Sequence, residues 1–405
     1  MFTDEYQKML HAGSMNSRKI LSALLCLAML FLPACGYRTQ SNAEPSKYEY
    51  IFVHGLSGWG SYDEAYKTMP YWGMLGGDLM KYLNREGYSS YAASVAPDGS
   101  AWDRACELYA QLAGTVVDYG KAHSEKYGHE RFGRDFSQDP LVPDWNDGRK
   151  IVLLGHSFGG ATIRLFSELL ANGSQEEREA TAEEDLSAIF KGGQSERIHA
   201  LVTLAAPTNG TTAYDMHDDE SFDIEAVEVS RWDMMMGKLF NSRKKSDPDV
   251  RASEDYAAYD MHIDNAMALN ERIETLPKTY YFAVPCSASW PDENGNHQPI
   301  RSIMEAMFRK SSTQMGSYSG KTKNGFEIDE SWKENDGLVN TVSAMAPMNA
   351  PSTEFDKNDL KPGIWNVMPP YIGDHMSLQG GMMKRNNVRP FYSELLSIIE
   401  NLPET

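Results

Sequence analysis

A serine in the segment Gly155-His156-Ser157-Phe158-Gly159 has the surroundings of an enzymatic nucleophile. The apolar run 151–154 leads directly into this segment, and a helical pattern over 161–170 follows it. A sharp turn between a strand and a helix holds a serine in a strained conformation and exposes its hydroxyl, which requires small neighbours. The context therefore predicts a nucleophile elbow at Ser157.

A serine hydroxyl is a weak nucleophile and needs a base. On such elbows the partners follow in the order Ser, then Asp or Glu, then His. His375 precedes the terminal helical pattern 391–401 and is the candidate base. Asp336, in a polar turn after the run 280–284, is the candidate that orients the imidazole. Asp374 is its main competitor, although side chains adjacent in sequence rarely meet in the geometry required.

Attack on an ester carbonyl also requires hydrogen-bond donors for the oxygen that becomes negatively charged. The backbone N–H of Phe158, directly after the serine, is one expected donor. The second should follow the first apolar run, 50–53, where His54-Gly55-Leu56 stands. We therefore predict that the backbone N–H groups of Leu56 and Phe158 form an oxyanion hole.

Short apolar runs and helical patterns alternate along the chain. The runs cover 50–53, 90–95, 151–154, 200–205 and 280–284, and the helical patterns cover 79–85, 161–170, 266–273 and 391–401. Such alternation indicates a parallel sheet with helices on both faces. Together with the elbow, it predicts an α/β-hydrolase fold over residues 48–405, with a central, mostly parallel sheet flanked by helices.

Two stretches interrupt the alternation. Residues 103–145 are irregular, and we interpret them as an insertion. Within 208–260 the apolar residues Val229, Trp232 and Met236 recur at helical spacing. This spacing predicts a short helical cap over the site, and a helix packed on the main core is the alternative.

The first 34 residues have the pattern of an export signal. We take Met15 as the true start, because basic residues and the apolar run 20–32 follow it, and that run is too short to span a bilayer. The sequence Leu-Pro-Ala-Cys-Gly around Cys35 is similar to a lipoprotein processing box, and acylation there would anchor the protein to a membrane. An ordinary cleaved signal peptide is the alternative. Residues 35–47 are polar and should form a tether.

The composition of the chain restricts the kinds of partner that the protein can bind. The chain has 57 acidic against 38 basic residues and a net charge of −19, which opposes a nucleic-acid partner because phosphate binding needs clustered Lys and Arg. Cys106 and Cys286 are the two cysteines of the globular body. We expect both to be free and buried, although export would permit a disulfide between them.

Longer motifs carry a family resemblance. They include HGLSGWG at 54–60, WDRACELYAQL at 102–112, VDYGKAH at 117–123, YGHERFGR at 127–134 and ENDGLVNT at 334–341. Over roughly residues 50–398 the chain resembles the true lipases of thermophilic bacilli and staphylococci. The resemblance implies a triad of Ser157, Asp336 and His375 that hydrolyses acylglycerols and other fatty-acyl esters. It also implies a structural role for His54.

The same family carries a zinc ion in an inserted subdomain. The resemblance assigns its ligands to Asp103, His123, His129 and Asp260. Two imidazoles and two carboxylates suit a closed, structural zinc site. The family also binds calcium through a Glu and an Asp shortly after the catalytic histidine. Here Ser377 and about Met382 stand at those positions, so we expect no such calcium site.

The segment 208–259 is shorter than the cap of those lipases, which predicts a more open cleft. Short-chain esters or polyesters are therefore alternative substrates to long-chain acylglycerols. Two further hypotheses use the same scaffold. A non-catalytic surface protein would be marked by a broken triad, and an acyltransferase would be marked by transfer to added alcohols.

Overall fold

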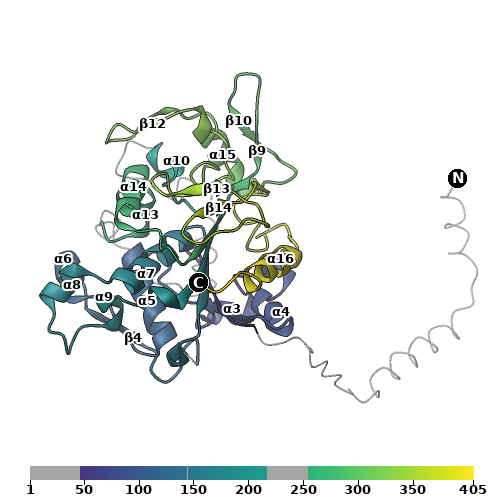
Figure 1. Cartoon of the computed structure of the whole chain (residues 1–405). Coiled ribbons are helices and arrows are strands. Elements are labelled where there is room, and N and C mark those ends of the chain that lie inside the picture. Colours follow the sequence, from purple (N-terminus) through teal and green to yellow (C-terminus); the bar gives the residue numbers. More distant parts are fainter. Residues whose placement is uncertain (1–45, 144, 217–253) are drawn as a thin grey trace, which may run out of the picture. The chain divides into compact units, whose positions relative to one another are not determined.

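The computed structural model describes residues 46–143, 145–216 and 254–405 (Figure 1). The predicted export signal, Cys35 and most of the tether lie outside the described residues. Most of the predicted cap, with the helical pattern that contains Val229, Trp232 and Met236, also lies outside them. Among the residues that are described, no helix has both the length and the apolar character needed to cross a bilayer.

A sheet of seven strands, with all neighbours parallel, forms the centre in the order β13-β14-β7-β6-β5-β1-β2. Its strands are β1 (Glu49–Val53), β2 (Ser89–Ala93), β5 (Ile151–His156), β6 (Ile198–Leu204), β7 (Tyr280–Val284), β13 (Ser352–Glu354) and β14 (Trp365–Val367). The first five agree with the predicted apolar runs, which confirms the predicted parallel sheet. The strands β14 and β13 were not predicted. The three residues of the edge strand β13 are all exposed and form no apolar run.

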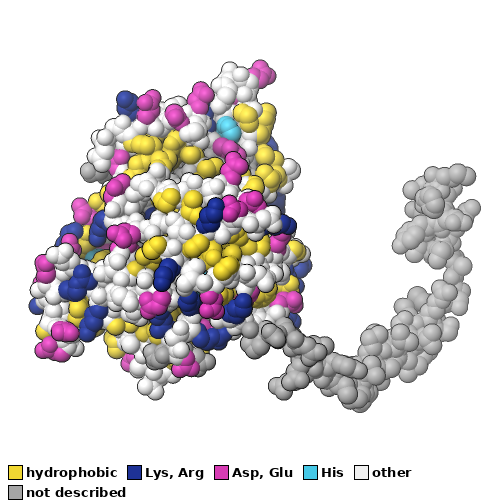
Figure 2. Space-filling view, viewed as in Figure 1, with side chains coloured by type: hydrophobic (Ala, Val, Ile, Leu, Met, Phe, Trp, Pro, Cys, Tyr) yellow, Lys and Arg dark blue, Asp and Glu magenta, His cyan; other side chains and the backbone are white. Residues whose placement is uncertain are grey.

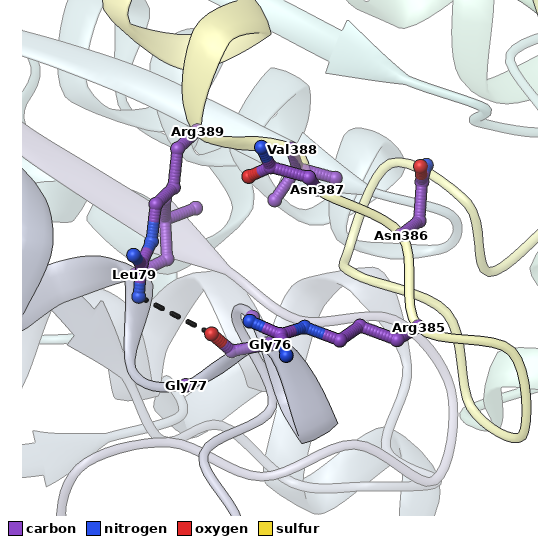
Figure 3. Close-up of a pocket in the computed structure, with 9 residues that line it drawn as sticks. Gly76, Gly77, Leu79, Arg385, Asn386, Asn387, Val388 and Arg389 are labelled. Carbon is purple, nitrogen blue, oxygen red and sulfur yellow. Dashed lines mark hydrogen bonds between the residues drawn. The ribbon is translucent and has the colours of Figure 1, made fainter.

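Side chains alternate between the two faces of the sheet, as they must in a strand. On one face Tyr50 and Phe52 of β1 pack with residues of α4 (Leu79–Arg85) and α16 (Arg389–Glu400). At the N-terminus of α16 the Nη2 of Arg389 donates to the carbonyl oxygen of Gly76, at 3.2 Å (Figure 3). This bond links the terminal helix to the loop that precedes α4.

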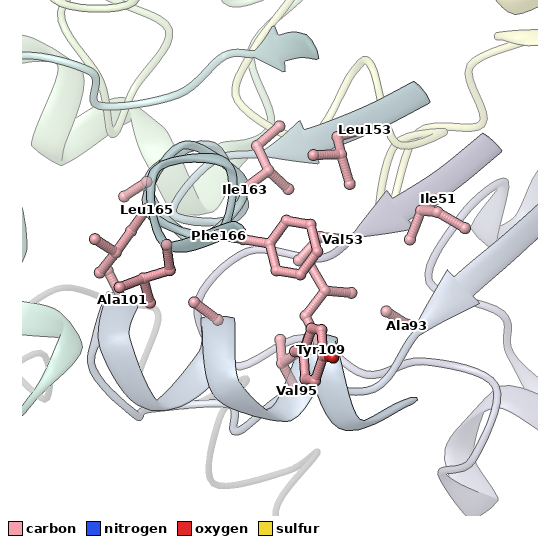
Figure 4. Close-up of a cluster of buried hydrophobic side chains, with 14 of the residues drawn as sticks. Ile51, Val53, Ala93, Val95, Ala101, Tyr109, Leu153, Ile163, Leu165 and Phe166 are labelled. Atoms are coloured by element: carbon pink, nitrogen blue, oxygen red, sulfur yellow. The ribbon is translucent and has the colours of Figure 1, made fainter. Parts of the chain in front are cut away.

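On the other face Ile51 and Val53 pack with α5 (Ala101–Ala113) and α7 (Gly159–Asn172). Figure 4 shows this layer, with Phe166 of α7 lying between the strands and Tyr109 of α5. Helices thus cover both faces, as the sequence predicts. The resulting core fixes the ends of β1 and β5, where the site residues begin.

Shorter elements surround this core. They are α3 (Glu64–Thr68), β3 (Val116–Asp118), α6 (Lys121–Tyr127), β4 (Phe132–Asp135), α8 (Gln175–Ala180), α9 (Ala188–Lys191), α10 (Thr212–Asp215), α13 (Ala257–Met261), α14 (Ile263–Arg272), β8 (Cys286–Ser287), β9 (Ser289–Pro291), β10 (His297–Pro299), α15 (Arg309–Met315), β11 (Gly320–Lys321), β12 (Glu327–Ile328) and β15 (Tyr371–Ile372), with short 3-10 turns between some of them. The stretch 103–145, predicted as an insertion, begins inside α5, whose buried residues belong to the main core. Its outlying part is the antiparallel pair β3 and β4 with α6 between them.

Both cysteines of the body are buried and free, as expected from the sequence. Burial raises the pKa of the Cys106 and Cys286 thiols well above the ordinary value, which keeps them protonated and unreactive. On the surface, acidic and basic side chains are interspersed with apolar ones over the face seen in Figure 2.

Candidate active site

The serine of the predicted elbow lies on a tight turn between β5 and α7. Its φ is +53°, a left-handed conformation that is strained for a residue with a side chain. The turn needs the glycines around it, because a Cβ on Gly155 would fall 2.4 Å from the carbonyl oxygen of Gly159. A Cβ on Gly159 would fall 2.4 Å from the carbonyl oxygen of Val53. The glycines at 155 and 159 thus make room for the tight turn that holds Ser157 in this conformation.

The structure brings Ser157, His375 and Asp336 together. The Nε2 of His375 lies 2.8 Å from the Oγ of Ser157, and its Nδ1 lies 2.9 Å from the Oδ2 of Asp336. A carboxylate only accepts hydrogen bonds, so Nδ1 carries the proton and Nε2 accepts from the serine hydroxyl. This arrangement can activate a serine, since the imidazole can take its proton and the carboxylate can stabilise the resulting cation.

The turn around Asp336 fixes its carboxylate. Its Oδ1 accepts from the backbone N–H groups of Leu338 and Val339, at 3.0 and 2.8 Å, which leaves Oδ2 for the imidazole. The competing Asp374 points elsewhere, because it accepts from the N–H of Glu305 and the hydroxyl of Ser377, both at 2.8 Å. Of the two acids that the sequence left open, the structure brings Asp336 to the histidine.

The loop after β1 lies directly beside the serine. A Cβ on Gly55 would fall 2.7 Å from the Cβ of Ser157 and 3.2 Å from its Oγ, so only glycine fits there. Among the described residues, neither the N–H of Leu56 nor that of Phe158 donates to another protein group. Both predicted donors are therefore free to bind an oxygen of a substrate.

A buried arginine that was not predicted as a site residue braces this loop. Arg104 is fully buried and donates to the carbonyl oxygen of His54, to the Oγ1 of Thr162 at 2.9 Å and to the carbonyl oxygen of Ala96 at 3.2 Å. Its guanidinium also lies 5.0 Å from the ring centroid of Phe158. The sequence does contain a signal for it, because Arg104 follows Ala101 by three residues and precedes Leu108 by four, which places it on the same face of a helix as these apolar residues.

Two histidines near Ser157, His54 and His156, are fully buried. We expect them to make the folded protein less stable in acid. Burial lowers the pKa of both His54 and His156 to about 3. Between the ordinary value of about 6.5 and that value, the unfolded chain binds protons that the folded chain does not, so stability falls as pH falls. Each histidine should contribute about 1.4 kcal/mol per pH unit to this loss.

Urea unfolding at pH 6.5 and pH 4.5 checks this expectation. The free energy of unfolding of His54→Gln should fall between these values by about 2–3 kcal/mol less than that of the wild type, because one proton-linked group is gone. An equal fall of the free energy of unfolding in both proteins would show that His54 does not contribute to the loss of stability in acid.

A second cluster of polar side chains lies in the β3, α6 and β4 region. Asp103, His123, His129 and Asp255 each direct one ligand atom into it, and these atoms all lie within 4.8 Å of one another. The Nε2 of His123 is 3.2 Å from Asp103 and 3.2 Å from Asp255, and the Nε2 of His129 is 3.3 Å from Asp255. A metal ion is the group that such a set of donors suits.

This cluster corrects one predicted ligand. The prediction of Asp260 is wrong, because its buried carboxylate accepts from the N–H of Ala101 at the start of α5, at 2.8 Å. The second acid of the cluster, beside Asp103, is Asp255. Its neighbour Tyr256 forms an antiparallel bridge with Gly99, four residues before Asp103.

The surrounding residues hold the two histidines. The ring of Trp102 stacks on His123, with centroids 5.0 Å apart, and Glu177 accepts from the backbone N–H of His123 at 2.8 Å. The Nδ1 of His129 donates to the carbonyl oxygen of Glu130, which leaves Nε2 for the cluster. Burial lowers the pKa of His123, but the carboxylates of Asp103 and Asp255 outweigh it and raise that pKa to about 9.

Ser377 and Met382, at the positions where the resemblance suggests the calcium ligands of the family, make other contacts. The hydroxyl of Ser377 donates to Asp374, and the N–H of Met382 donates to the Oε1 of Glu305 at 2.8 Å. These bonds hold the segment that follows His375. The carbonyl oxygen of Gln379 accepts from Gly73 at 2.7 Å, next to the glycine loop seen in Figure 3.

Comparisons with known proteins match this geometry to a family. The family model described as "Lipase-like, C-terminal domain" matches residues 46–247 and 239–399. The chain therefore belongs to this lipase family. Lipase 1 of Staphylococcus aureus is 32% identical over 374 residues, covering 86% of this chain and 53% of that protein. This member of the family thus spans about half the length of the staphylococcal lipases that it matches.

Solved structures agree with the assignment to the lipase family. EstA from Clostridium botulinum has a TM-score of 0.78 and 32% identity, covering 91% of this chain and 90% of its own. Staphylococcus hyicus lipase has a TM-score of 0.74 and 31% identity, covering 87% and 97%. These matches confirm the family and the α/β-hydrolase fold that the sequence predicts.

Proposed function

We propose that the protein is a carboxylic ester hydrolase of the lipase type that works through an acyl-enzyme. The observation that supports this most is the continuous set of hydrogen bonds from Ser157 through His375 to Asp336, at 2.8 and 2.9 Å. In this proposal Ser157 is the nucleophile, His375 the general base and then acid, and Asp336 the residue that orients the imidazole.

The geometry supports a specific sequence of steps. The Oγ of Ser157 attacks the acyl carbonyl while its proton passes to the Nε2 of His375. The carbonyl oxygen, now negative, accepts from the N–H groups of Leu56 and Phe158. The imidazolium gives its proton to the departing alcohol, which leaves an ester on Ser157. Water, deprotonated by His375, then releases the acid and restores the serine.

Graded substrates test the substrate class. We expect hydrolysis of p-nitrophenyl esters from acetate to palmitate and of emulsified triacylglycerol, together with covalent labelling by a fluorophosphonate. Ser157→Ala should abolish the labelling. Activity on short esters alone would replace the lipase assignment with an esterase, and an inert wild type would overturn the proposal. Product analysis with added alcohol separates hydrolysis from acyl transfer.

For the second cluster we propose a structural zinc ion held by Asp103, His123, His129 and Asp255. Ligand atoms about 2.0–2.1 Å from a tetrahedral ion lie about 3.3 Å from one another, which is close to the spacings of 3.2 and 3.3 Å. Four protein ligands leave no position for a reacting water. The ion would join α5 and the β3, α6 and β4 region to the chain around Asp255.

For location we propose export from the cytoplasm, with a lipid anchor at Cys35. The proposal rests on the basic and apolar pattern of residues 15–34 and on the sequence around Cys35. Radioactive palmitate incorporation into the wild type but not into Cys35→Ser tests the anchor. An unlabelled wild type that is cleaved and released would favour an ordinary signal peptide.

A further inference from the structure

A buried chain of hydrogen bonds passes behind the proposed catalytic serine and connects the two loops on either side of it. The N–H of Gly55 donates to the hydroxyl oxygen of Tyr71 at 3.2 Å. That hydroxyl lies 2.6 Å from the Nδ1 of His156, and the Nε2 of His156 lies 2.8 Å from the carbonyl oxygen of His375. The chain thus begins beside the predicted donor Leu56 and ends on the backbone of the proposed base.

The direction of every bond in this chain is determined. The carbonyl oxygen of His375 can only accept, so the Nε2 of His156 must carry a proton. A neutral imidazole then has an acceptor at Nδ1, and the Tyr71 hydroxyl must donate to it. The hydroxyl oxygen accepts from Gly55 in turn. Each donor has one acceptor, and hydrogen bonds aligned in this way reinforce one another.

The surroundings hold His156 in this neutral form. Its ring is fully buried, and burial lowers its pKa to about 3. The ring of His375, whose centroid lies 5.1 Å from that of His156, is the second cause that lowers the pKa of His156. Tyr71 is also buried, at 3% exposure, and its ring contacts those of His54, Trp59 and Trp72. Both side chains are buried, so we assign neither of them a catalytic role.

The backbone of His375 is fixed at both its polar groups. Its N–H donates to the carbonyl oxygen of Asp336 at 3.0 Å, and its carbonyl oxygen accepts from His156. Without the second bond, the imidazole could still pair with Asp336 but could shift relative to Ser157. Small displacements of a reacting group cost large factors in rate.

We propose that Tyr71 and His156 are positioning residues. They fix the loop that carries the predicted donor Leu56 relative to the base His375, so that both contact the same reacting carbonyl. This inference rests on the proposed function, because it assigns a task to residues behind that site. It predicts that the two residues act as one unit. Their loss should lower kcat and leave the binding of the ester largely unchanged.

Tyr71→Phe tests the first link. This change removes one hydroxyl and keeps the ring, and we expect kcat to fall about 10- to 100-fold with KM within about twofold. Tyr281→Phe is the matched control, because the hydroxyl of Tyr281 also accepts a backbone N–H, from Leu276 at 2.9 Å, near the start of β7 and outside the Tyr71–His156 chain. Equal kcat values for Tyr71→Phe and the wild type would overturn the proposal.

Substitutions of His156 test whether Tyr71 and His156 act as one unit. His156→Gln keeps an amide donor for the carbonyl oxygen of His375, so it should retain more kcat than His156→Leu. In the His156→Leu background, adding Tyr71→Phe should cost less than about twofold, since the link to His375 is already lost. Fully additive losses, or losses confined to KM, would show two independent packing residues.

Nitrogen NMR separates this inference from the proposed function. In the wild type the ring of His156 should be neutral with its proton on Nε2, and Tyr71→Phe should shift the ring signals of His375 where Tyr281→Phe does not. These signals are measurable even in a protein that cleaves no ester. An inactive wild type with these shifts would overturn the hydrolase proposal alone, and unshifted His375 signals would overturn the positioning role.

Discussion

The substitution Asp336→Asn is expected to lower kcat for ester hydrolysis about 10⁴-fold, while Asp374→Asn should change kcat only a few-fold. The Oδ2 of Asp336 accepts from the Nδ1 of His375, and an amide can donate there instead. The imidazole would then carry its proton on Nε2 and could no longer accept from Ser157. Steady-state kinetics on a soluble p-nitrophenyl ester measures the loss.

The matched variant makes this test sharp. Asp374 is as buried as Asp336 and adjoins His375, but its oxygens accept from Glu305 and Ser377. Asp374→Asn should therefore lower the melting temperature without removing the general base. If Asp374→Asn lost the activity and Asp336→Asn kept it, the two carboxylates would exchange roles.

Local patterns predicted the parts of the fold that local sequence encodes. Apolar runs such as 151–154 fix buried strands by themselves, and the glycines around Ser157 fix the turn that follows. The strand β13 could not be found in this way, because its exposed residues Ser352 to Glu354 pair with β14 only after the rest of the sheet exists. Edge strands depend on neighbours more than on their own composition.

The residues of the site show the same difference between what local sequence encodes and what tertiary contacts decide. The elbow pattern predicted Ser157 and the order of residues suggested His375, but the acid was ambiguous because distances across the fold decide it. The role of Tyr71 could not be predicted from the sequence, since it comes from a bond to the ring of His156, 85 positions away. Residues that act by holding others are recognised only once tertiary contacts are known.

Of Asp255 and Asp260, only Asp255 should bind the proposed zinc, and the loss of that ion should give the largest effect on stability that we expect. Asp255→Ala should lose the bound metal, and Asp260→Asn should keep it. A ligand present at about 1,000 times its Kd stabilises the folded state by about 4 kcal/mol, and Asp255→Ala should lose a stabilisation of that order. Metal analysis and the melting temperature of each purified variant measure both effects.

Chelation and pH provide independent checks of the same cluster. A chelator should lower the melting temperature of the wild type and of Asp260→Asn but not that of Asp255→Ala, which has no ion to lose. The pKa of His123 is raised to about 9 without a metal, so an ion must displace a proton at neutral pH. Apparent affinity should therefore rise from pH 6 toward pH 9. Metal retained in full by Asp255→Ala and lost by Asp260→Asn would restore Asp260 as the ligand.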